Sequence, residues 1–246
     1  FGRGVVPTPD NFGGLGEKPT HPRLLDHLAR KFMESGWSVK AMHRLMMNSA
    51  TYRQSSDADV ALLEYDPESK LFDRWQRRRV ESEVIRDSIL MKSNRLDFTM
   101  GGSMLVLRPN KYVDRGKLNE HSLVPRRTVY LPVYRSSGYD GQKAFDAADP
   151  AVPDGNRRTS TVAGQALFLM NSELMHESSK SLPDLVLAEA EGNRPAWLVK
   201  HVLGRDATEE ESARGEAFVK GYGDEKGALA AFARVLLSSN EFLYVE

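Results

Sequence analysis

The feature that most constrains the fold is where helical periodicity occurs along the chain. Apolar residues recur at helical spacing in the first and last thirds of the sequence. Residues 96–160 lack that period and contain Pro109, Pro125, Pro132, Pro150 and Pro153. Within them only residues 128–135 alternate as a short strand does. The sequence therefore predicts a mainly α fold: one helical domain over residues 1–246, with a long irregular central segment that contains a short strand or hairpin.

Two helices are expected near the N-terminus. Thr20 is the expected cap of the first, with Pro22 in its first turn and Gly36 after its end. Ser38 is the expected cap of the second, and the short connection predicts an antiparallel hairpin. Five apolar residues are expected to be mostly buried on the facing sides, namely Leu25, Leu28, Phe32, Leu45 and Met46.

Further helices are expected after this pair and in the C-terminal third. Their ranges are residues 80–93, 163–179, 195–203 and 226–239. Gly204 is placed to close the third of these helices. Thr208 and Glu211 fit a capping box, in which each residue bonds the backbone N–H of the other at the start of a helix.

Composition excludes several classes of protein. Lys plus Arg equals Asp plus Glu, at 34 each, so no net positive field attracts nucleic acid and no nucleic-acid partner is expected. Cysteine is absent, which excludes disulfides, thiolate metal sites and covalent c-type haem attachment within this sequence. No apolar run approaches the roughly 20 residues that span a bilayer, and the histidines lack zinc-site spacing, so no metal site is expected. The start at Phe1 without Met and without a signal-peptide pattern indicates a fragment of a longer protein.

Tyrosine and arginine are concentrated in the central segment, and both anchor interfaces and flat polar ligands. The candidate ligand- or partner-binding residues are Tyr130, Tyr134, Arg135, Asp146, Arg157 and Gln165. A polar network is expected among Arg53, Glu83, Arg86 and Asp87. A plainer interpretation is that the arginines pair with aspartates and hold an irregular core together. The aspartates in question are Asp140, Asp146, Asp149 and Asp154.

Several motifs, taken together, resemble a known family. They are FGRGVV at residues 1–6, SGWSVK at 35–40, SATYRQSS at 49–56, RRTVYLPVYR at 126–135, TVAGQALFLMNS at 161–172 and SNEFLYV at 239–245. This set resembles the planctomycete-specific domain of unknown function that is found C-terminal to planctomycete cytochrome c domains. The resemblance extends over nearly the whole chain and implies that residues 1–246 are a C-terminal fragment of a larger multidomain protein.

The resemblance implies a cellular location and neighbouring domains, but it implies no activity. It implies an extracytoplasmic location, in the periplasm or at the cell surface, with c-type haem only in an upstream domain and no cofactor in this chain. The partners that it implies are the upstream domains of the same parent protein, and a cell-surface glycan or protein is a further expected partner.

Two functions stay open at this point. One is a non-catalytic binding or assembly module associated with cytochrome c-type domains. The other is a catalytic domain, either a hydrolase or a haem-linked oxidoreductase, with a polar cleft formed by the central segment. Six polar residues decide between the two, namely Arg53, Glu83, Asp87, Arg135, Asp146 and Gln165. A buried cluster of them without a cavity favours the module, whereas the same residues around a pocket with a free carboxylate favour the enzyme.

Overall fold

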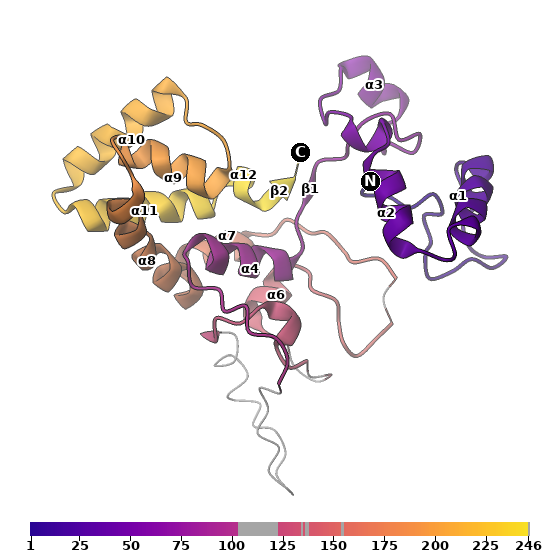
Figure 1. Ribbon diagram of the computed structural model, residues 1–246, viewed down its shortest axis with the longest axis horizontal. Coiled ribbons are helices and arrows are strands. Elements are labelled where there is room, and N and C mark those ends of the chain that lie inside the picture. Colours follow the sequence, from indigo (N-terminus) through magenta and orange to yellow (C-terminus); the bar gives the residue numbers. More distant parts are fainter. Residues whose placement is uncertain (103–122, 134, 136–137, 154, 246) are drawn as a thin grey trace, which may run out of the picture. The chain divides into compact units, whose positions relative to one another are not determined.

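The computed structural model describes residues 1–102, 123–133, 135, 138–153 and 155–245. Within these residues the chain is mainly helical, which confirms the predicted fold class. The chain divides into two compact units, the first formed mainly by residues 1–78 and the second mainly by residues 79–153 and 157–244. Strands β1 (Arg78–Arg79) and β2 (Tyr244–Val245) pair in a two-stranded sheet (Figure 1).

The first unit contains the two helices expected near the N-terminus. The elements in order are α1 (Pro22–Glu34), α2 (Val39–Met47), the 3₁₀ turn η1 (Thr51–Arg53) and α3 (Val60–Tyr65). Ser38 caps α2 as predicted, since its hydroxyl accepts a hydrogen bond from the N–H of Ala41 at 3.2 Å. The residue before α1 is His21 and not the predicted Thr20, whose hydroxyl instead donates to the carbonyl of Val5.

The predicted buried face of this helix pair is wrong in part. Leu25 and Leu45 are 38% and 44% exposed, and the other three predicted residues are half-buried. Aromatic side chains from the irregular part of the unit pack together instead, with the rings of Tyr52 and Trp75 5.1 Å apart. An aromatic ring buries more apolar area than an aliphatic side chain. A few such rings therefore account for much of the packing in this unit, and they lie outside the helix pair.

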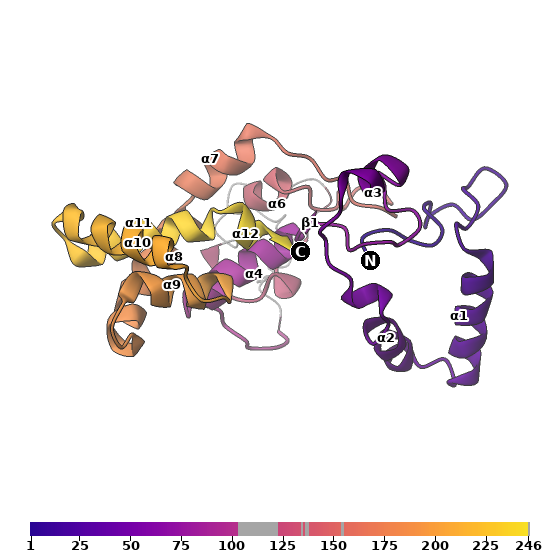
Figure 2. The same cartoon turned by 90° about the horizontal axis from the view of Figure 1, so that it is seen from above.

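The second unit holds most of the described helices. They are α4 (Ser82–Lys92), η3 (Thr128–Tyr130), α6 (Asp140–Ala144), α7 (Ala163–Asn171), α8 (Glu173–Glu189), α9 (Arg194–Leu203), α10 (Glu209–Tyr222), α11 (Glu225–Leu237) and α12 (Asn240–Leu243). Figures 1 and 2 both show α8 to α11 as one group of helices. Its buried core includes Leu182, Leu198 and Leu229, and it continues into α4 through Ile85 and Ile89.

Local signals correctly predict two helix ends in this unit. Gly204 ends α9 with a φ of 82°, in the left-handed region that glycine adopts without steric cost. The capping box of α10 is present, because Thr208 Oγ1 accepts from the N–H of Glu211 and the Glu211 carboxylate accepts from the N–H of Thr208.

Three other predictions for this unit are wrong. The helix expected over residues 163–179 is two helices, because Ser172 has extended backbone angles and its hydroxyl accepts from the N–H of Met175 to begin α8. The strand expected at residues 128–135 is absent from the described residues of that range, and Thr128–Tyr130 forms the 3₁₀ turn η3. Residues 140–144, expected to be irregular, form α6.

Candidate functional site

Arg86 and Asp87 on α4 lie at the centre of a buried hydrogen-bond network. The guanidinium of Arg86 donates to the carbonyls of Val124 and Arg126 at 2.6 and 2.8 Å. Asp87 accepts from the N–H and the hydroxyl of Thr128 at 2.8 and 2.6 Å. Burial lowers the pKa of Arg86, and the carboxylate of Asp87 opposes that effect. The network holds the segment that contains η3 against α4.

A second network closes the other end of the central segment. Asp146 accepts hydrogen bonds from the guanidinium of Arg79 at 2.6 Å and from the N–H and hydroxyl of Ser160, both at 2.8 Å. The buried amide of Gln165 donates to the carbonyls of Ala144 and Ser160, each at 3.0 Å. Asp146 and Gln165 are therefore brought together through Ser160, and they fix the chain that connects α6 to α7.

Glu83 and Arg157 form a third polar contact. The two guanidinium nitrogens of Arg157 donate to the two carboxylate oxygens of Glu83 at 2.6 and 3.0 Å. Burial raises the pKa of Glu83, but the hydrogen bonds from Arg157 and neighbouring groups outweigh it, and the pKa lies below its usual range. This two-pronged geometry is the strong form of an arginine–carboxylate pair.

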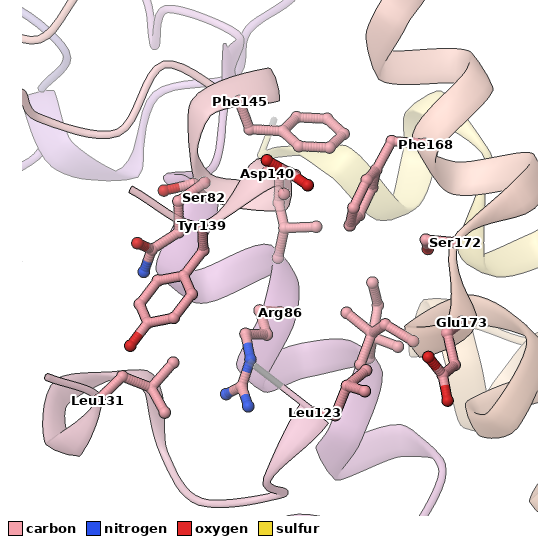
Figure 3. Close-up of a pocket in the computed structure, with 15 residues that line it drawn as sticks. Ser82, Arg86, Leu123, Leu131, Tyr139, Asp140, Phe145, Phe168, Ser172 and Glu173 are labelled. Atoms are coloured by element: carbon pink, nitrogen blue, oxygen red, sulfur yellow. The ribbon is translucent and has the colours of Figure 1, made fainter. Parts of the chain in front are cut away.

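A cavity of about 360 Å³ opens between α4, α6, α7 and the start of α8 (Figure 3). Its apolar wall is formed by Ile85, Ile89, Leu123, Leu131, Tyr139, Phe145, Phe168 and Leu174. Arg86 is the cationic side chain among the described residues that line it. A cavity of this size is in the range of sites that hold small molecules.

Close packing fixes the aromatic wall of the cavity. The rings of Phe145 and Phe168 meet edge to face, 6.0 Å apart. Gly141 lies against Phe168 so closely that a Cβ atom there would be 2.6 Å from the ring. The buried Tyr139 is oriented by its hydroxyl, which donates to the carbonyl of Pro132 at 2.8 Å. These contacts hold three aromatic rings in place around the cavity.

Two carboxylates, Asp140 and Glu173, also line the cavity, together with the hydroxyl-bearing Ser82 and Ser172. Glu173 is exposed and its carboxylate accepts no hydrogen bond from the described part of the chain. Figure 3 places Asp140 beside Phe145 and Glu173 on another side of the cavity, while Arg86 extends toward Leu123 and Leu131.

The remaining predicted site residues are not among the described residues that line the cavity. The ring of Tyr130 is stacked with the guanidinium of Arg126, 5.0 Å from its centroid, and does not line the cavity. Arg135 is exposed and also does not line the cavity. Arg53 is exposed and lies in η1 of the first unit, whereas Glu83, Arg86 and Asp87 lie in α4 of the second. Tyr134 lies outside the described residues.

Sequence reasoning missed several residues that build this region. Arg79 and Ser160 complete the network of Asp146, and Phe168 forms part of the cavity wall. Arg79 lies in a run of mostly basic residues, 74–79, for which the sequence indicates salt bridges at the start of a helix, but its partner Asp146 is 67 positions away. Phe168 lies in a motif noted only for its resemblance. Tyr139 stands between Gly138 and Gly141 in a stretch without a periodic signal, so its burial could be found only from the structure.

Two observations concern metal binding and membrane insertion. Among the residues that the structure describes, no group of three histidine, aspartate or glutamate side chains has a geometry that could hold a metal ion. No described helix is long and apolar enough to cross a membrane.

A family model described as "Protein of unknown function (DUF1553)" matches residues 1–219 of the chain. No curated protein and no solved structure matches it.

Proposed function

We propose that this chain, which belongs to the planctomycete-specific protein family of unknown function DUF1553, is a non-catalytic binding module. The observation that supports the proposal is that the polar networks of the central segment are separate from the apolar cavity beside it. Its charged side chains bond to one another and to backbone groups, while the adjacent cavity has a mainly apolar wall. An apolar cavity with a few polar groups is the usual form of a small-molecule site.

The proposal includes a setting, which rests on the family resemblance alone. In that setting the module works outside the cytoplasm, beside upstream domains of a parent protein that carry c-type haem. The cavity then gives an assembly module a means to hold a ligand near those domains.

The networks supply an argument against a catalytic role for the carboxylates predicted from sequence. Asp87 and Asp146 each accept several hydrogen bonds, and Glu83 is paired with Arg157. The pKa of Asp146 and that of Glu83 are both below their usual ranges, so both groups stay ionised and are weak proton acceptors. None of these three carboxylates lines the cavity, and no histidine is among its described lining residues.

The cavity proposal can be tested with phenylbutanol, a neutral probe with an aromatic ring and a short aliphatic chain. Isothermal titration with the chain of 246 residues is expected to show one binding site, and the probe should raise the melting temperature, as any ligand of the folded state does. The Leu123→Trp variant is expected to lose the binding heat. Leu123 lines the cavity and is 40% exposed, so the larger ring can occupy space there without disturbing the core.

The matched control is Val129→Trp. Val129 is 71% exposed, lies in the same stretch of chain and does not line the cavity. This variant should bind phenylbutanol as the parent chain does. Equal binding by both tryptophan variants, or no binding by the parent chain, would overturn the proposal.

A further inference from the structure

We infer that the cavity selects a small molecule that has an apolar, ring-containing body and a positively charged amine. This inference names the ligand class for the proposed binding module and therefore rests on that function. Two independent observations carry it: the aromatic wall and the distribution of charge around the cavity.

The aromatic wall indicates the body of the ligand. Tyr139, Phe145 and Phe168 contribute rings, and Ile85 and Leu131 contribute aliphatic surface. The rings are fixed by the contacts of Gly141 with Phe168 and of Tyr139 with Pro132, so little ordering is needed when a ligand enters. At about 360 Å³ the cavity is more than twice the size of the roughly 150 Å³ cavity that accepts benzene. A ring with a short chain attached uses this space better than a single ring.

The charge distribution indicates the head group of the ligand. The described lining residues contain one cation, Arg86, and two anions, Asp140 and Glu173. Arg86 forms an ion pair with Asp87 and donates to two backbone carbonyls, so its charge is compensated within the protein. Asp140 also interacts with another group, which leaves Glu173 as the charge of the described lining that no described residue pairs with. The described wall of the cavity is therefore negative at Glu173. Negative potential in a cleft with low-dielectric walls favours a cation over a neutral or anionic group.

Glu173 is the residue through which this preference can be tested. It is exposed at the first position of α8, and among the described residues no side chain or backbone group donates a hydrogen bond to it. Replacing its carboxylate by an amide removes the charge with little change in shape. The fold is therefore expected to tolerate Glu173→Gln, unlike changes in the buried networks.

The experiment compares three probes of equal size: phenylbutylamine, phenylbutanol and phenylbutyrate, which are cationic, neutral and anionic near neutral pH. Titration of the full chain at low salt should give the order amine, alcohol, carboxylate, with the amine about two- to fivefold tighter than the alcohol, the range of a solvent-exposed ion pair. In Glu173→Gln the advantage of the amine should fall while the affinity for the alcohol is unchanged. Added salt should reduce the same advantage.

Glu191→Gln is the control for net charge, since Glu191 is exposed and does not line the cavity. It should leave the preference for the amine intact. If the alcohol binds and the amine binds no better, or if Glu173→Gln keeps the full preference, the inference on charge is overturned and the binding module stands. If the carboxylate binds most tightly, Arg86 is the recognition group and the inference is overturned. If none of the three probes binds, both the inference and the proposed function fail.

Discussion

Arg79 Nη2 lies 2.6 Å from Asp146 Oδ2, which joins two residues that are 67 positions apart in the chain. The Arg79 side chain is only 4% exposed, and its guanidinium also lies over the ring of Phe145, 5.4 Å from the centroid. The pair therefore links β1 to the end of α6 and supports a ring that lines the cavity. Asp146 holds this position with a φ of 56°, in the left-handed region where aspartate and asparagine are better tolerated than most residues.

Asp146→Asn is expected to lower the free energy of unfolding by about 3 kcal/mol, because it leaves the buried guanidinium of Arg79 without its anionic partner. Asparagine suits the backbone conformation of Asp146 equally well, so the change isolates the loss of charge. Urea denaturation measures the effect. Asp149→Asn is the control, since Asp149 is exposed and its side chain accepts, among the described residues, only from the nearby N–H of Ala151. A loss of similar size in both variants would contradict the assignment.

Acid is expected to destabilise the second unit through Glu83 and Asp146. Burial raises the pKa of each, but hydrogen bonds from Arg157 to Glu83, and from Ser160 and Arg79 to Asp146, outweigh burial and lower both values. The unfolded chain then binds protons more readily than the folded chain. The stabilisation is complete above the unfolded pKa values of about 4 and is lost as the pH falls through the lower folded values.

Urea denaturation at a series of pH values between neutral and about pH 3 measures this loss of stability. The double variant Glu83→Gln, Asp146→Asn should be less stable at neutral pH and should depend less on pH below about 5. The two slopes are compared over the pH range in which both proteins remain folded without urea. An unchanged slope in the double variant would show that other carboxyl groups cause the acid sensitivity.

The ends of helices α9 and α10 could be predicted from the sequence because the signals for them are local. Gly204 and the pair Thr208 and Glu211 act within a few residues of the helix ends that they define. The signal of Ser172 is equally local, but Ser172 stands inside a stretch whose apolar periodicity continues past it. Periodicity therefore does not predict the break between α7 and α8. The spacing of apolar residues shows which face of a helix is apolar, but it does not show whether the backbone stays helical throughout.

The central segment could be predicted less well because its order comes from distant contacts. Residues 128–135 alternate as a strand does, but Thr128 bonds to Asp87, which is 41 positions earlier, and no described strand lies beside it. A strand without a partner leaves its backbone groups unsatisfied, whereas η3 and the contacts with Asp87 and Arg86 satisfy several of them. The polar residues were identified from the sequence, but their partners Arg79, Thr128 and Ser160 depend on the fold.

Gly141→Ala is expected to destabilise the protein by about 1–3 kcal/mol, the usual cost of overpacking. The new Cβ would lie 2.6 Å from the Phe168 ring, so either α6 or the ring must move. The same movement should weaken binding of phenylbutanol, because both elements line the cavity. Thermal or urea unfolding and probe titration measure the two effects.

Gly164→Ala is the matched control for this change. Gly164 lies in α7 with no atom near the added Cβ, and alanine favours a helix over glycine by up to about 1 kcal/mol. The control should therefore be neutral or stabilising. If Gly141→Ala behaves in the same way, α6 does not pack against Phe168 in solution.

Thr128→Val tests the network of Arg86 and Asp87 with a change that keeps the shape of the side chain. The buried hydroxyl of Thr128 donates to Asp87 at 2.6 Å and accepts from Arg86 at 3.1 Å, so valine removes one partner from each charged group. The expected cost in unfolding free energy is about 1–3 kcal/mol, the range for leaving buried polar groups unsatisfied. Thr128→Ser keeps the hydroxyl and loses only a methyl group, at a cost of about 0.8 kcal/mol. Urea denaturation should rank the threonine chain first, serine second and valine last, and a valine variant as stable as the parent chain would show that the hydroxyl does not hold η3 against α4.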